Sequence, residues 1–225
     1  MCLTIPEDYH QICPLRKSLQ RSGLVSRDGP RFVHAIFQEV TYRNISPRWN
    51  AAYHRDIGEA YERLYRSEDA AFELARHFSY TREHRKILKY ATLAGEKAES
   101  SIAPEQASRY YETALASAEE LADICAKSEL LVRCGDCYML LGDLGKALGK
   151  YLAALDADIE DSAKASVYRK AAMVHEKMGD YAASIKDCEA GIVLLGGARE
   201  REGVMLLLAQ ASASIRMGIT DGAMD

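Results

Sequence analysis

The stretch that decides the fold is SELLVRCGDCYMLLGDLGKALGKYLAA, residues 128–154. In its first half, Leu131, Cys134 and Tyr138 recur at the spacing of one helix face, and its second half repeats such a pattern. Between the halves, Gly142 supplies the backbone freedom that a helix end needs. The stretch therefore predicts two amphipathic helices joined by a tight turn. One such hairpin cannot bury its apolar faces alone, so further copies are expected.

Copies of the hairpin recur along the chain. A shift of 37 residues places Met178-Gly179-Asp180 on the turn at Gly142, and a further shift of 39 residues places Met217-Gly218 there, with Ala223 early in a following helix. The small and aromatic positions are Ala147, Tyr151 and Ala154 in the second half of the first hairpin. In the other copies they are Gly95, Ala98, Ala107, Tyr111, Ala114, Ser184, Cys188 and Gly191. Self-similarity at this period is typical of a helical solenoid.

The order of residue types resembles the tetratricopeptide repeat: large apolar, small, Gly or Ala, aromatic, Gly turn, Ala, aromatic, Ala. The resemblance implies an all-α, tetratricopeptide-type α-solenoid with repeats at about 82–120, 125–158, 162–195 and 201–225, the last incomplete. The spacing exceeds the usual 34 residues, which predicts longer helices or links. An ordinary antiparallel bundle with alanine-rich seams is the alternative, and glycine turns in phase with the alanines favour the solenoid.

Charge divides the chain of 225 residues into two parts. Residues 1–98 contain 16 Lys and Arg against 12 Asp and Glu, whereas residues 99–225 contain 13 against 21, so the net charges are +4 and −8. No apolar run approaches the roughly 18 residues of a membrane span. The start, MCLTIPED, lacks the basic and apolar regions of a signal peptide. We expect a cytoplasmic protein that does not enter the membrane.

The cysteines include a C-x-x-C pair, Cys134 and Cys137, which suggests metal or redox chemistry. The pair lies inside a predicted helix, with no second C-x-x-C and no nearby pair of histidines. Cys134 and Cys188 occupy inward positions of their repeats, and a free cysteine commonly behaves as a small buried hydrophobe. We therefore predict packing roles and no metal site.

Residues 1–45 differ from the repeats. They predict a short helix at 15–20, two short strands at 23–27 and 31–34 around Asp28-Gly29-Pro30, and a helix at 34–42. This order resembles the end of a winged-helix domain, with its β-hairpin. The piece is too small to bury a core of its own.

Longer phrases resemble the region that follows the nucleotide-binding domain in STAND-class signal-transducing ATPases, including multidomain regulators with adenylate/guanylate cyclase or transcription-factor modules. The phrases are HAIFQEVTY (34–42), YHRDIGEA (53–60), ELARHF (73–78) and YATLAGEKA (90–98), and the resemblance covers nearly the whole chain. It implies that His34 contacts the phosphates of a nucleotide held by a parent ATPase domain. The alternative for His34 is a polar residue between a strand and a helix.

Residues 46–81 predict a pair of helices that caps the solenoid and links it to the winged-helix segment. Ser46 and Pro47 suit a helix start, and a second helix is predicted over 68–80. His54 and His77 are expected on the helix surface or in a seam. The basic run 82–89 is interleaved with core residues, so it indicates a solvated helix face and makes nucleic acid an unlikely partner.

The concave wall of such a solenoid is lined by the first helix of each repeat. The repeat register predicts a partner-binding groove for a protein or peptide, formed by Arg133, Asp136, Met139, Leu140, Arg169, Lys170, Met173 and Lys177. The cations among them can pair with an acidic peptide or with the solenoid's own acidic neighbours. Asp136 and Met173 stand where chaperone-type carboxylate clamps use Asn, which argues against recognition of a free C-terminal carboxylate.

Catalysis is not expected, because the chain has no G-x-x-x-x-G-K-[ST] and no recognisable nucleophile–base pattern. The predicted function is a non-catalytic protein–protein interaction scaffold without a cofactor, the regulatory or sensor arm of a STAND-type ATPase. The alternative is a DNA-binding transcriptional regulator that uses the winged-helix portion. Because the last repeat lacks its second helix, we expect a fragment whose uncapped end, with Leu206, Leu207, Leu208 and Ile215, favours self-association.

Overall fold

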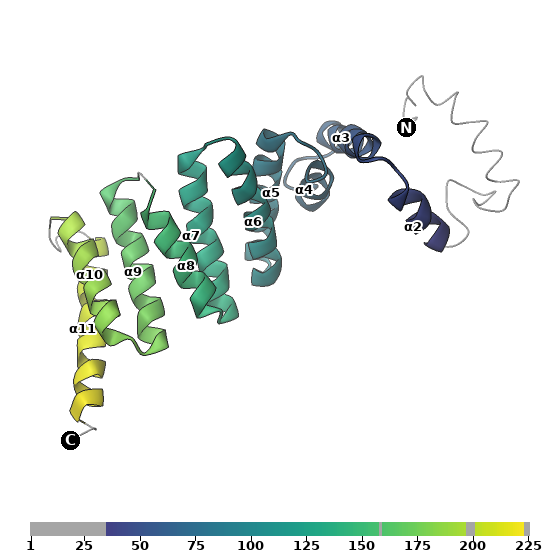
Figure 1. Cartoon of the computed structure of the whole chain (residues 1–225). Helices are drawn as coiled ribbons and strands as arrows, with labels where there is room; N and C mark the ends of the chain where they lie inside the picture. Colours follow the sequence, from purple (N-terminus) through teal and green to yellow (C-terminus); the bar gives the residue numbers. More distant parts are fainter. Residues whose placement is uncertain (1–34, 158, 197–200, 223–225) are drawn as a thin grey trace, which may run out of the picture. The chain divides into compact units, whose positions relative to one another are not determined.

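The computed structural model describes residues 35–157, 159–196 and 201–222, and this part of the chain is helical, without a strand. The chain divides into two compact units, Met1–Asn50 and Ala51–Asp225. The helices, shown in Figure 1, are α2 (Ala35–Arg43), α3 (Pro47–Leu64), α4 (Ala71–Phe78), α5 (His84–Ser100), α6 (Pro104–Glu120), α7 (Ile124–Leu141), α8 (Leu144–Leu155), α9 (Asp161–Met178), α10 (Tyr181–Leu194) and α11 (Arg201–Gly222).

The predicted winged-helix segment falls mostly outside the described residues. The helix predicted at 15–20, the β-hairpin at 23–34 and His34 all lie there. The helix predicted at 34–42 is present as α2. The helical repeats therefore make up the fold that can be described, and the hairpin stays a prediction.

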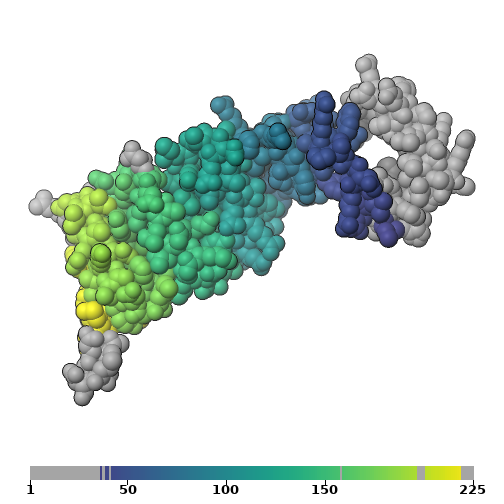
Figure 2. Space-filling model, in the orientation of Figure 1, coloured from purple at the N-terminus to yellow at the C-terminus, as the bar shows by residue number. Residues whose placement is uncertain are grey.

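From α4 to α11, each helix packs against the next one in sequence, and α11 also contacts α9 (Figure 1). In the space-filling view, the surfaces of these helices follow one another without a break from teal to yellow (Figure 2). Packing between sequence neighbours is what distinguishes a repeat array from a bundle closed around one central core. The predicted helical-repeat solenoid is confirmed at this level.

Two of the three predicted glycine turns join paired helices. Gly142 and Gly179 end α7 and α9 with φ angles of 76° and 83°, in the left-handed region that favours glycine. The aspartate that follows each glycine caps the next helix. The side chain of Asp143 accepts a hydrogen bond from the backbone N of Lys146, and Asp180 accepts one from that of Ala183.

The third predicted turn, at Met217-Gly218, is wrong, because α11 continues through both residues to Gly222. Isoleucine follows this glycine, so the chain lacks the aspartate that starts α8 and α10 after the other two turns. A glycine alone is tolerated inside a helix at a cost of about 1 kcal/mol. Without a capping side chain directly after the glycine, the existing helix is extended.

A glycine facing an aromatic ring brings the helices of a pair close together. A Cβ atom built on Gly135 would lie 2.4 Å from Cε1 of Tyr151, and one built on Gly95 would lie 2.4 Å from Cε1 of Tyr111. Both tyrosines are buried. Any larger residue at either glycine would displace the ring, so these pairs set the helix separation.

Small residues fill the rest of the seam, as predicted. The small positions Ala107, Ala114, Ala147, Ala154 and Ser184 are fully buried, with 0% exposure. In the third repeat, Ala172 and Cys188 occupy the positions of Gly135 and Tyr151 and join one buried cluster. Within the described residues, no helix combines the length and apolarity that a bilayer span requires.

Candidate functional site

The predicted groove residues gather on the face formed by the first helices α5, α7, α9 and α11, called here the first-helix face. A pocket of about 400 Å³ lies between α7 and α9 on this face. It is called the α7–α9 pocket, and its lining consists of Asp136, Met139, Leu140, Tyr151, Arg169, Lys170, Met173 and Lys177. Seven of the eight predicted residues line it. Tyr151 joins them from α8, and Arg133 is not part of the lining.

Arg133 is bound by carboxylates of its own chain. Its guanidinium lies 3.3 Å from Glu96 and 3.4 Å from Glu99, both on α5, and 3.0 Å from Glu129 on α7. It also donates a hydrogen bond of 3.2 Å to the hydroxyl of Tyr111. With these partners, Arg133 links α7 to the preceding repeat and has little capacity left for a ligand.

Asp136 is held from two sides in the same way. The hydroxyl of Tyr151 donates to its carboxylate at 2.7 Å, and the ammonium of Lys170 contacts both carboxylate oxygens. Burial and the hydrogen bond to Asp136 raise the pKa of Tyr151 above its ordinary value, so the hydroxyl stays protonated and remains a donor. The lysine therefore connects α9 to α7.

The ion pairs of Arg133 and Lys170 recur at equivalent positions of successive repeats. Lys170 stands 37 residues after Arg133, at the equivalent position, and each cation pairs with an acid on the preceding first helix. Those acids, Glu96 and Asp136, are also equivalent. In the third repeat this acidic position holds Met173. The series of acids is therefore interrupted by an apolar side chain, and the α7–α9 pocket opens beside it.

The remaining pocket residues combine an apolar floor with one cation that has no ion pair. Leu140 is 73% exposed and Met173 is 39% exposed. Arg169 is paired with Glu202 of α11 at 2.6 Å. Among the residues that the structure describes, Lys177 makes no ion pair, and its side chain is exposed. The pocket thus offers apolar surface beside a free ammonium group.

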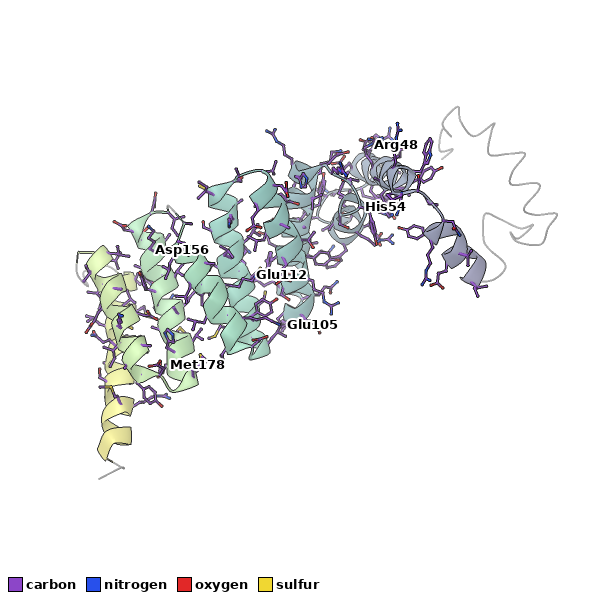
Figure 3. The ribbon with its side chains drawn as sticks, viewed as in Figure 1. Arg48, His54, Glu105, Glu112, Asp156 and Met178 are labelled. Carbon is purple, nitrogen blue, oxygen red and sulfur yellow. The ribbon has the colours of Figure 1, made fainter. Side chains whose placement is uncertain are left out.

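Two histidines form a buried contact between α3 and α4 that the sequence spacing did not reveal. The Nδ1 atoms of His54 and His77 lie 2.9 Å apart, and the ring of His54 (labelled in Figure 3) stacks on Tyr80 at 4.2 Å. Arg76 lies 3.2 Å from Nε2 of His77. Arginine is always a donor, so Nε2 accepts and Nδ1 of His77 donates to His54. Both imidazoles are therefore neutral.

Cys134 and Cys188 are buried at the inward positions predicted for them. Cys134, Cys137 and Cys188 are buried, and burial raises the pKa of the Cys134 thiol to about 12. A thiol of that pKa is protonated at neutral pH and is a poor nucleophile. Within residues 35–157, 159–196 and 201–222, no group of three or more His, Cys, Asp or Glu side chains is placed to hold a metal ion.

No protein-family model matches this chain. No curated protein sequence matches it either. Among solved structures, the chain is similar to the apo form of the quorum sensor NprR from B. thuringiensis, with 15% sequence identity and a TM-score of 0.35. That match covers 91% of this chain and 70% of the NprR chain.

The predicted site contains Asp136, the acid that pairs with Lys170, but it lacks Tyr151 and three acids that pair with the arginines, Glu96, Glu99 and Glu202. The sequence predicts only a packing role for Tyr151, although its hydroxyl reaches the groove through Asp136. The repeat period contains a signal for the pairing, because Glu96 stands one repeat before Asp136. Glu202 has no such signal, since its contact depends on how α11 lies against α9.

Proposed function

We propose that this chain is a non-catalytic scaffold that binds a protein or peptide segment on its first-helix face. The observation that supports the proposal is the α7–α9 pocket, where Leu140 and Met173 expose apolar surface beside the ion-paired Arg169 and Lys170. Exposed apolar surface rimmed by polar groups is typical of interaction sites. Methionine adapts its shape to a partner at little cost.

The scaffold proposal is tested by panning a phage-displayed library of random peptides against the immobilised full chain. Enriched peptides are then synthesised with a fluorescein label and titrated with the protein in fluorescence anisotropy. We expect Leu140→Lys and Met173→Lys to abolish binding. The control is Val193→Lys, which places the same charge at an exposed apolar residue of α10. Absence of any binding peptide, or equal binding by all three variants, would refute the proposal.

We further propose that the scaffold is the regulatory arm of a STAND-type ATPase signalling protein. The support is the resemblance of residues 34–42, 53–60, 73–78 and 90–98 to that class. The test is to sequence the DNA that flanks the reading frame and to co-express any encoded G-x-x-x-x-G-K-[ST] domain with this chain. A stable complex is expected, and a flanking region without such a domain would contradict the proposal. The DNA-binding alternative depends on residues 1–45, most of which lie outside the described part.

Self-association through α11 is a second part of the proposal. The side chains of Val204, Leu207, Leu208 and Ile215 are 46%, 45%, 62% and 64% exposed along one side of this helix. Residues 203–215 carry no formal charge. Two copies of such a helix can pair about a two-fold axis without opposing charges. Sedimentation velocity is expected to show dimers that Leu208→Glu dissociates, and monomer at high concentration would refute this.

A further inference from the structure

The chemistry of the partner can be inferred from the charges and apolar groups of the α7–α9 pocket. This step rests on the proposed scaffold function and adds the class of ligand. Two of the three cations that line the pocket are already neutralised: Lys170 by Asp136 and Arg169 by Glu202. The carboxylate of Asp136 is in turn occupied by Lys170 and by the hydroxyl of Tyr151. The pocket therefore has no carboxylate free to receive a basic ligand.

Lys177 is the cation of this pocket that remains available. It follows Met173 by one helical turn on α9, so the two side chains emerge on the same side of the helix. It also stands 37 residues after Leu140, at the equivalent position of the next repeat. A ligand that covers Leu140 and Met173 thus brings its neighbouring groups close to an ammonium group without an ion pair.

A nucleic acid does not fit this arrangement. Nucleic-acid sites depend on several cations that neutralise successive phosphates, and single-strand sites add aromatic rings on which bases stack. The α7–α9 pocket offers one unpaired cation, and its exposed surface is aliphatic and thioether rather than aromatic. A ligand with a single carboxylate next to an apolar side chain matches both the one unpaired cation and the apolar surface of the pocket.

We propose that the α7–α9 pocket binds a peptide segment that carries an apolar side chain and a nearby side-chain carboxylate. The apolar group lies against Met139, Leu140 and Met173, and the carboxylate pairs with Lys177. Burial of the apolar surface supplies most of the affinity, and the ion pair, which becomes shielded from water on binding, supplies the preference for acidic sequences.

The test uses the fluorescein-labelled peptides enriched by panning on the full chain, each paired with a version in which Asp is changed to Asn and Glu to Gln. We expect the amide versions to bind about fivefold to tenfold more weakly. Lys177→Glu is expected to weaken the acidic peptides by at least as much and to leave the amide versions nearly unchanged. The matched control is Lys186→Glu, which makes the same charge change at an exposed lysine of α10 outside the pocket.

A charge-swapped peptide completes the test. A peptide in which Lys replaces the carboxylate residue should bind Lys177→Glu better than it binds the unaltered chain. If peptides bind but neither the amide change nor Lys177→Glu alters their affinity, this inference is overturned while the scaffold function stands. If no peptide binds, the scaffold function fails and the inference fails with it.

Discussion

Replacement of Gly135 by alanine probes the contact that sets the distance between α7 and α8. The added Cβ atom would lie 2.4 Å from Cε1 of Tyr151 and 2.8 Å from Cδ1. The ring has little room to withdraw, because Tyr151 is only 1% exposed and its hydroxyl is held by Asp136 at 2.7 Å. Either the helices separate or the ring leaves its site.

The size of the effect follows from three contributions. Forcing an extra carbon into a packed core costs about 1–3 kcal/mol. Loss of the hydrogen bond to a carboxylate adds about 1.5–3 kcal/mol if the ring moves. Alanine is favoured over glycine inside a helix by about 1 kcal/mol, which acts in the opposite direction. If the ring is displaced, we therefore expect Gly135→Ala to lower the free energy of unfolding by about 1.5–5 kcal/mol.

The matched control is Gly149→Ala in α8. A Cβ atom at this glycine meets nothing within 4 Å, so only the gain in helix propensity remains. This variant should be about 0.5–1 kcal/mol more stable than the unaltered chain. Urea denaturation followed by far-ultraviolet circular dichroism measures both. The reasoning is refuted if Gly135→Ala is as stable as the unaltered chain, or if the two variants change stability in the same direction.

Three further predictions concern pH, the first-helix face and one strained turn. Burial and contact with His77 lower the pKa of His54 below its ordinary value of 6.5. Below about pH 6.5 the unfolded chain therefore binds more protons than the folded chain, so the melting temperature should fall on acidification. The fall should be less steep in His54→Asn, which lacks this titrating group. An identical pH slope in the two proteins would contradict this. Asp136→Ala should cost about 1–3 kcal/mol in urea denaturation because the buried Tyr151 hydroxyl loses its acceptor, whereas Asp136→Asn keeps an acceptor and should cost less. Ile102 is 89% exposed and has a φ angle of 55°, in the left-handed region that strains a residue with a Cβ atom. The variant Ile102→Gly should therefore be about 0.5–1 kcal/mol more stable in urea denaturation. A lower denaturation midpoint would count against strain at this turn.

The sequence alone was sufficient to predict the repeats and most of the residues around the α7–α9 pocket. Helix faces, glycine turns and capping aspartates depend on residues a few positions apart, so their signals are local. Once the 37-residue shift aligned Gly179 with Gly142, residues at equivalent positions of α7 and α9 were expected on one face. The structure places seven of the eight predicted groove residues around one pocket for this reason.

The extent of α11 required the structure, although the reason is visible in the chain. Met217-Gly218 matches the repeat pattern weakly, yet the helix continues because isoleucine, and not a capping aspartate, stands directly after the glycine. Position in the repeat predicts where a helix is able to end. Whether it does end depends on the competition between extending one helix and starting the next.

Which groove cations are free was decided by the tertiary structure. From sequence, Arg133, Arg169, Lys170 and Lys177 were equally able to meet a ligand or the chain's own acids. The structure engages the first three with carboxylates and leaves Lys177 without an ion pair within the described residues. The sequence likewise did not determine that His54 and His77 are in contact. Local patterns specify the face on which a side chain lies, whereas an ion pair or a ring contact needs atoms within a few ångströms, and only the packing of one helix against another sets those distances.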